Sequence, residues 1–137
     1  MYQIYFLSIL TNIVAGIALG FDRMDKGLRL RAAFNADLFQ HTGFRLALGL
    51  ITFMVGFLKL LSVTSGDVAV VGDLVPALAG LLMGFGLAFQ YYRERAQVTS
   101  SVVESLDRVF GRNSATLGTV GVLAGVVHFF LPRVLFL

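Results

Sequence analysis

The chain has 137 residues, of which 57% are hydrophobic and only 14% are charged, and its formal net charge is +3. A soluble domain of this length needs more charge to cover its surface, so the composition excludes an ordinary soluble protein. The chain contains no cysteine, which excludes disulfides, thiol redox chemistry and cysteine metal ligands.

Four apolar blocks follow one another along the chain. Residues 1–21, 46–58 and 74–92 carry no charged side chain, and residues 113–132 carry none apart from His128. A helix needs about 20 apolar residues to cross a hydrocarbon core of about 30 Å. The first block lacks the basic start of a signal peptide, so we expect it to be a retained helix. The sequence therefore predicts an all-α membrane protein, in which residues 1–137 form one domain of four transmembrane helices.

Basic residues gather in the two segments that join the first block to the second and the third block to the fourth. The segment between the second and third blocks has Asp67 and Asp73 and no base. The positive-inside rule predicts that both basic segments are cytoplasmic and both termini lie outside, with a prokaryotic inner membrane as the expected location. This distribution favours anionic lipid on the cytoplasmic face as a partner, and it argues against nucleic acid. The expected lipid or partner surface consists of Arg23, Lys26, Arg29, Arg31, Arg93, Arg95, Arg108 and Arg112.

Each basic segment is expected to contain a short amphipathic helix along the inner surface. In the second segment Ser101 and Glu104 have the spacing of a capping box, and Gly111 can end the helix. Two readings stay open: a solvated cap that packs on the bundle, or docking to anionic lipid or a partner, to which each Lys or Arg adds about 1 kcal/mol. The apolar positions are Leu30, Phe34 and Leu38 in the first segment, and Val98, Val102, Leu106 and Val109 or Phe110 in the second.

The two halves of the chain resemble each other. Gly16 and Gly20 align with Gly80 and Gly84, because each pair follows an alanine and precedes a phenylalanine at the same spacing. The second and fourth blocks align in the same way, with Lys59 opposite His128. We therefore expect two parallel repeats, residues 1–65 and 73–137, related by a pseudo-twofold axis along the membrane normal.

Glycines recur at helical spacing in all four blocks, which favours close helix packing in lipid. Such faces either hold one chain's bundle together or join it to another chain, so a homo-oligomer or a larger membrane-protein partner is expected. The expected packing glycines are Gly16, Gly20, Gly49, Gly56, Gly80, Gly84, Gly118, Gly121 and Gly125.

Lys59 interrupts the second block, and His128 lies in the fourth. A helix that enters the membrane at Arg45 carries Lys59 about 21 Å up, within about 9 Å of the outer boundary. The lysine stem can snorkel to outer headgroups, to water or to the acidic loop. Alternatively Lys59 and His128 form an outward-facing polar site, since ionisable residues at membrane depth are functional candidates. That candidate site comprises Lys59, His128, Asp67, Asp73 and Arg133.

Two stretches carry a family resemblance. "FRLALGLITFMVGFLKLL" is similar to the "R…LG…G..K" helix of small DoxX-type four-helix membrane proteins, and "LAGVVHFFLP" resembles the "GxxHFxxP" of some members. Some DoxX-type proteins are accessory subunits of membrane oxidoreductase complexes. The resemblance therefore implies a subunit and gives no catalytic residue.

The chain has no phosphate loop, GxSxG, HExxH or paired histidines or carboxylates within a helix, so we expect no enzyme activity, metal or cofactor. The first hypothesis is a non-enzymatic subunit or scaffold of a membrane complex, which uses its glycine faces and basic helices. The alternative is a small oligomeric transporter or channel with its site at Lys59 and His128. A third reading is a lipid-binding protein that uses the basic inner face.

Overall fold

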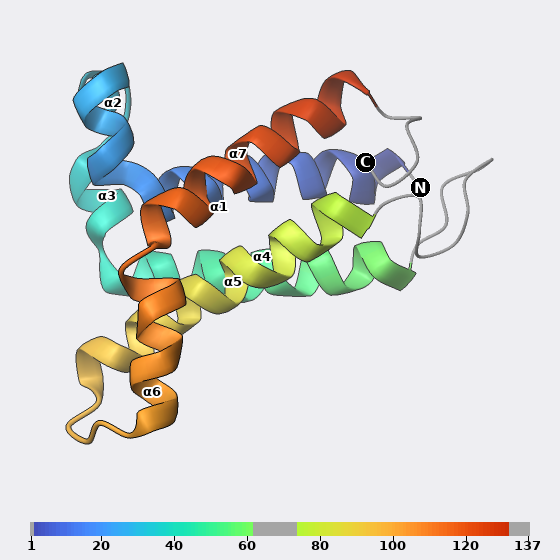
Figure 1. Cartoon of the computed structure of the whole chain (residues 1–137). Coiled ribbons are helices and arrows are strands. Elements are labelled where there is room, and N and C mark those ends of the chain that lie inside the picture. The colour runs from blue at the N-terminus through green and yellow to red at the C-terminus, as the bar shows by residue number, and fades with distance from the viewer. Residues whose placement is uncertain (1, 62–73, 132–137) are drawn as a thin grey trace.

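The computed structural model describes residues 2–61 and 74–131, and nearly all of these are helical (Figure 1). Four long helices carry the apolar blocks: α1 (Tyr2–Leu28), α4 (Thr42–Leu61), α5 (Leu74–Arg95) and α7 (Ser114–Phe130). Short helical pieces lie between them: α2 (Leu30–Ala33), α3 (Ala36–Gln40), α6 (Ser101–Leu106) and the π-helical turn η1 (Asp107–Gly111). The prediction of an all-helical chain is confirmed.

Three of the long helices are long and apolar enough to cross a membrane: α1, α4 and α5. A fourth candidate span arises if α6 and η1 are taken together with α7, from which they are bent by 50°. By itself α7 has 17 residues, which extend about 26 Å. The described residues thus hold three to four candidate spans.

The long helices run side by side, and the short helices lie at one end of the bundle (Figure 1). The tightest pairs are α1 with α7 and α4 with α5, while α1 also touches α4 and α5, and α5 touches α7. We call the end with α2, α3, α6 and η1 the basic end, because both basic segments lie there. The expectation that these segments share one side of the bundle therefore agrees with the fold.

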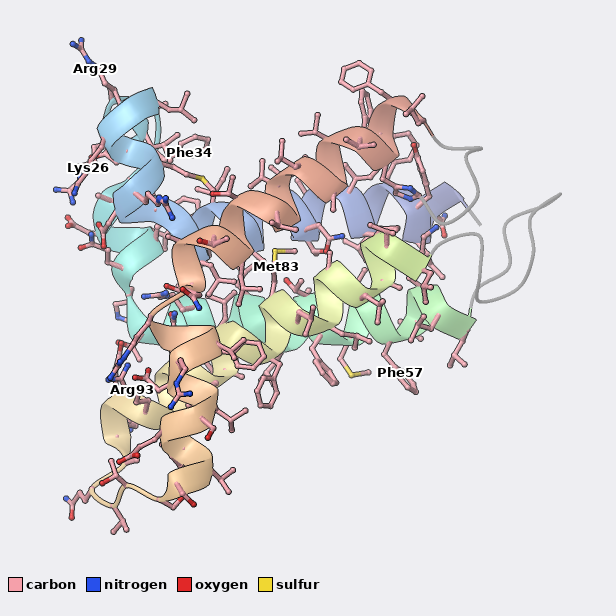
Figure 2. All side chains as sticks on the ribbon, in the orientation of Figure 1. Lys26, Arg29, Phe34, Phe57, Met83 and Arg93 are labelled. Atoms are coloured by element: carbon pink, nitrogen blue, oxygen red, sulfur yellow. The ribbon has the colours of Figure 1, made fainter. Side chains whose placement is uncertain are left out.

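The outward faces of the long helices are apolar. Phe57 points away from the bundle, whereas Met83 lies between the helices (Figure 2). The exposed side chains include Phe6, Leu10, Leu50, Ile51, Met54, Leu78, Leu82, Val120, Leu123 and Phe129. A surface of this kind is unusual for a monomeric soluble protein.

The first basic segment differs from the prediction of one amphipathic helix. Helix α1 continues through Arg23 and Lys26 to Leu28 before the backbone turns at Arg29, whose φ is 51°. The helical turn of α2 then ends at Phe34, which is extended. Asn35 begins α3 by accepting hydrogen bonds from the backbone N–H groups of the two residues after Ala36. The helix is divided because asparagine favours a helix start over a helix interior.

The predicted capping box at Ser101 is wrong by one residue. Ser100 is the N-cap, and its hydroxyl accepts a hydrogen bond of 3.3 Å from the backbone N–H of Val103. Helix η1 ends at Gly111, as expected, but without a left-handed turn, since Arg112 keeps right-handed helical dihedrals. Gly111 leaves room for the Asp107 carboxylate, because an added Cβ would lie 1.8 Å from one of its oxygens and the side chain would have to shift.

Candidate functional site

The glycines of the two tight helix pairs bring backbones into contact. In the α1–α7 pair, an added Cβ at Gly16 would lie 2.6 Å from the carbonyl oxygen of Gly118. In the α4–α5 pair, an added Cβ at Gly84 would lie 2.6 Å from the carbonyl oxygen of Gly49. Real Cβ atoms do not approach backbone so closely, so these positions have room only for glycine.

The remaining predicted packing glycines also face neighbours within the chain. Gly121 lies against Met83, whose sulfur would be 1.8 Å from an added Cβ. The other contacts are Gly20 with Met24 and Ala115, Gly56 with Ala77 and Gly80, and Gly125 with Ile9 and Ile13. All nine glycines are therefore used by contacts inside this bundle.

The half of the bundle away from the basic end has a polar interior. We call this set the polar cluster: Tyr5, Ser8, Asn12, Thr52, Lys59 and His128. Their exposed fractions run from 0% for Thr52 and His128 to 9% for Tyr5, and the Lys59 side chain is only 1% exposed. Lys59 is therefore buried rather than exposed at the surface, and its predicted reach to the acidic loop lies outside the described residues.

Tyr5 of α1 links the two ionisable residues of the polar cluster. Its hydroxyl donates a hydrogen bond of 2.8 Å to the carbonyl oxygen of His128, and its ring lies 4.7 Å from the imidazole, centroid to centroid. The ammonium nitrogen of Lys59 lies 5.4 Å from the centroid of the same ring. This distance is in the range of a cation–π contact, which contributes up to about 2 kcal/mol when desolvated. The bundle thus brings Lys59 and His128, distant in sequence, to one side chain.

Three further polar side chains extend the cluster toward the middle of the bundle. Asn12 donates a hydrogen bond of 2.9 Å to the carbonyl oxygen of Pro76, and Gly80 leaves room for the approach. Thr52 donates a bond of 2.7 Å to the carbonyl oxygen of Leu48 in its own helix. The buried hydroxyl of Ser8 has no hydrogen-bond partner among the described residues.

An apolar layer separates the polar cluster from the basic end. It is built around Met83 and Leu87, which are 1% and 0% exposed. Its other members are Ala15, Ala18, Leu19, Phe21 and Leu48. The interior therefore changes along its length from polar to apolar before the charged end.

Of the predicted polar site, Asp67, Asp73 and Arg133 lie outside the described residues, so only Lys59 and His128 are placed. Sequence reasoning missed Tyr5, Ser8 and Thr52 as parts of the site. Tyr5, Ser8 and Asn12 are spaced three and four apart in an uncharged block, so they share one helix face. This polar stripe on one face of the first apolar block is the feature of the sequence that could have predicted the α1 part of the site.

The predicted basic surface is divided between several places. Arg23, Lys26 and Arg93 line one pocket at the basic end. Arg29 points away from the bundle (Figure 2). Arg31 pairs with Asp25 at 3.0 Å and with Asp22 at 3.4 Å. The other three are Arg95, stacked on the ring of Tyr91, and Arg108 and Arg112, which lie with Asp107 beside α6.

The fold and the candidate site describe an all-helical protein with three to four candidate membrane spans and a polar interior. Residues 1–128 match the model of an uncharacterised protein family, and the chain belongs to that family. An uncharacterized protein of Treponema pallidum (strain Nichols) is 28% identical over 137 residues, which cover all of both chains. No solved structure matches the chain.

Proposed function

We propose that the chain is an integral membrane protein with four spans, whose basic end is cytoplasmic and whose termini are outside. Support comes from the apolar outward faces of the long helices and from the gathering of charge at one end. A prokaryotic inner membrane is the proposed location.

Within the membrane, the chain acts as a small transporter whose polar cluster holds an anionic solute in transit. One observation carries this proposal: Lys59 and His128 are both buried inside the bundle, and both lie close to the ring of Tyr5. Polar and ionisable groups are costly to keep at membrane depth, and they typically mark solute or proton pathways. Both ionisable groups placed in the cluster are basic, which favours an anion.

The proposed transporter replaces the subunit hypothesis as the first reading because the glycine faces are occupied. A subunit was expected to meet its partner through those faces and through the basic helices, and the glycines of the faces contact neighbours inside the chain. A subunit or scaffold stays the second candidate, supported by the short helices that project at the basic end (Figure 1). The resemblance to DoxX-type proteins stays a prediction.

An internal repeat is part of the proposal. A twofold axis that exchanges α1 with α5 and α4 with α7 turns the α1–α7 pair into the α5–α4 pair, and both pairs are tight. It also brings the contact of Gly16 with Gly118 onto that of Gly84 with Gly49. This match supports the repeat. It aligns Gly16 with Gly84, whereas the sequence alone aligns Gly16 with Gly80, which is one helical turn earlier.

Anion flux in proteoliposomes tests the transporter. Gradients of chloride, phosphate and lactate are imposed in turn, and wild-type protein is expected to carry at least one of them faster than empty vesicles. Lys59→Leu and His128→Leu should lose that flux while keeping the native oligomer. Arg29→Gln, which removes an exposed charge at the basic end, is the matched control and should keep it.

Full flux in both variants, or none in the wild type, would contradict the transporter. The second candidate is then tested by the mass of the complex after gentle extraction from its own membrane. A stoichiometric larger partner chain supports the subunit, and a homo-oligomer with no partner opposes it.

A further inference from the structure

A pocket of about 680 Å³ opens at the basic end of the bundle, on the far side of the apolar layer from the polar cluster. Its walls come from the last turns of α1, from α3, from the starts of α4 and α7 and from the end of α5. We call it the basic pocket, because its charged lining comprises Arg23, Lys26, Arg45 and Arg93 but only two carboxylates, Asp22 and Glu94. The volume is in the range of pockets that hold small ligands or headgroups.

Three of the four cations have no carboxylate within 4.0 Å among the described residues: Arg23, Lys26 and Arg45. Arg45 donates to the side-chain oxygen of Gln90, which is neutral. Its Nε is buried and has no acceptor in the described part of the chain. Among the described residues, Arg23 donates only to the hydroxyl of Thr116, at 3.2 Å. These cations retain unused donors.

The carboxylates of the lining are engaged elsewhere. Asp22 pairs with Arg31 at 3.4 Å, and Glu94 accepts a hydrogen bond of 2.9 Å from the hydroxyl of Thr42. The fourth cation, Arg93, is held by Asp107 of η1. Asp22 and Glu94 offset part of the charge of the four cations, and the lining keeps an excess of positive charge.

The start of helix α7 adds to the positive potential of the basic pocket. The 17-residue helix α7 begins at Ser114, and Ser114 and Ala115 line the pocket. Its N-cap residue, Asn113, makes no side-chain hydrogen bond to the first turn. The free N–H groups and positive dipole end of such a turn favour an anion, and phosphate above all.

We propose that the basic pocket binds the phosphate group of an anionic ligand. Several cations from different helices and a helix start converge there, which suits the spread charge of a phosphate. The phosphate belongs either to the headgroup of an acidic lipid of the inner leaflet or to a small soluble phosphate. This site goes beyond the proposed transport, because binding at the basic end does not require a solute to pass the apolar layer.

The test uses the full chain, purified in a neutral detergent, and two probes. Inorganic phosphate is titrated while the unfolding temperature is followed. Phosphatidylglycerol is compared with phosphatidylcholine at equal amounts by native mass spectrometry, which counts the lipids that stay bound. Arg45→Gln and Arg23→Gln remove donors of the pocket, and Arg29→Gln removes the same charge outside it. Circular dichroism checks that each variant is folded, and Arg23→Gln carries the test if Arg45→Gln does not fold.

We expect the wild type to bind at least one probe, and the pocket variants to bind it about tenfold more weakly or worse, because each loses a charged donor. Arg29→Gln should bind like the wild type. Binding of inorganic phosphate identifies a soluble ligand, whereas retention of phosphatidylglycerol alone identifies a lipid headgroup. The proposal is overturned if neither probe binds, or if Arg29→Gln weakens binding as much as Arg23→Gln does. The binding test is independent of the transport test, so a loss of flux in Lys59→Leu would not change the expected binding of phosphate or of phosphatidylglycerol.

Discussion

Tyr5 serves two purposes in the polar cluster. The carbonyl oxygen of His128 belongs to the last turn of α7, where the helix itself supplies no donor. The Tyr5 hydroxyl supplies that donor, while the face of its ring lies near the ammonium group of Lys59. In a bilayer no water can replace these contacts, so the residue ties the start of α1 to the end of α7.

Tyr5→Phe separates the two purposes, because it removes the hydroxyl and keeps the ring. We expect a loss of about 1 kcal/mol in the free energy of unfolding, the usual value for one buried hydrogen bond. Tyr92→Phe is the matched control, since Tyr92 is 54% exposed and its change should have no measurable effect. Reversible unfolding in mixed micelles gives both values. Equal stability of the two variants would mean that the Tyr5 hydrogen bond contributes nothing.

At the scale of elements, glycine position determines how closely the helices approach. Gly84→Ala places a Cβ 2.5 Å from the backbone nitrogen of Phe53, so α4 and α5 must move apart. We expect a loss of about 1–3 kcal/mol of stability, as for other overpacked sites. Gly27→Ala is the control, because nothing lies within 4 Å of its added Cβ, and alanine in a helix gains up to about 1 kcal/mol. Thermal unfolding of both variants measures the difference, and a Gly84→Ala protein as stable as Gly27→Ala would contradict the close packing.

The long helices could be predicted from the sequence, and the short ones could not be placed well. Blocks without charge indicate α1, α4 and α5 because hydrocarbon tolerates little else. The break between α1 and α2 depends on the left-handed backbone of Arg29, and the break between α2 and α3 depends on the N-cap Asn35. The apolar spacing of this segment predicts neither break. Whether Lys59 faces water or the interior depends on how α4 is rotated against α1 and α5. That rotation is set by contacts such as Gly49 with Gly84, which join segments distant in sequence.

The whole molecule has one basic end and one end where α1 begins and α7 finishes (Figure 1). The basic pocket opens at the basic end, and the polar cluster lies toward the opposite end. For the proposed membrane protein, orientation therefore decides which compartment the basic pocket and the polar cluster each face. An anionic inner leaflet would meet the basic pocket only if the basic end is cytoplasmic.

Single cysteines test that orientation directly, because the chain has none of its own. Gln3→Cys places a thiol on the exposed start of α1, and Arg29→Cys places one on the exposed turn after its end. In intact cells a membrane-impermeant maleimide should label Gln3→Cys, and it should label Arg29→Cys only after the membrane is opened, since the positive-inside rule keeps the basic end within. The reverse pattern would put the basic pocket outside and the polar cluster near the cytoplasm. Labelling of both cysteines in intact cells would mean that the chain inserts in two orientations, and a transporter built from it would then be an antiparallel assembly.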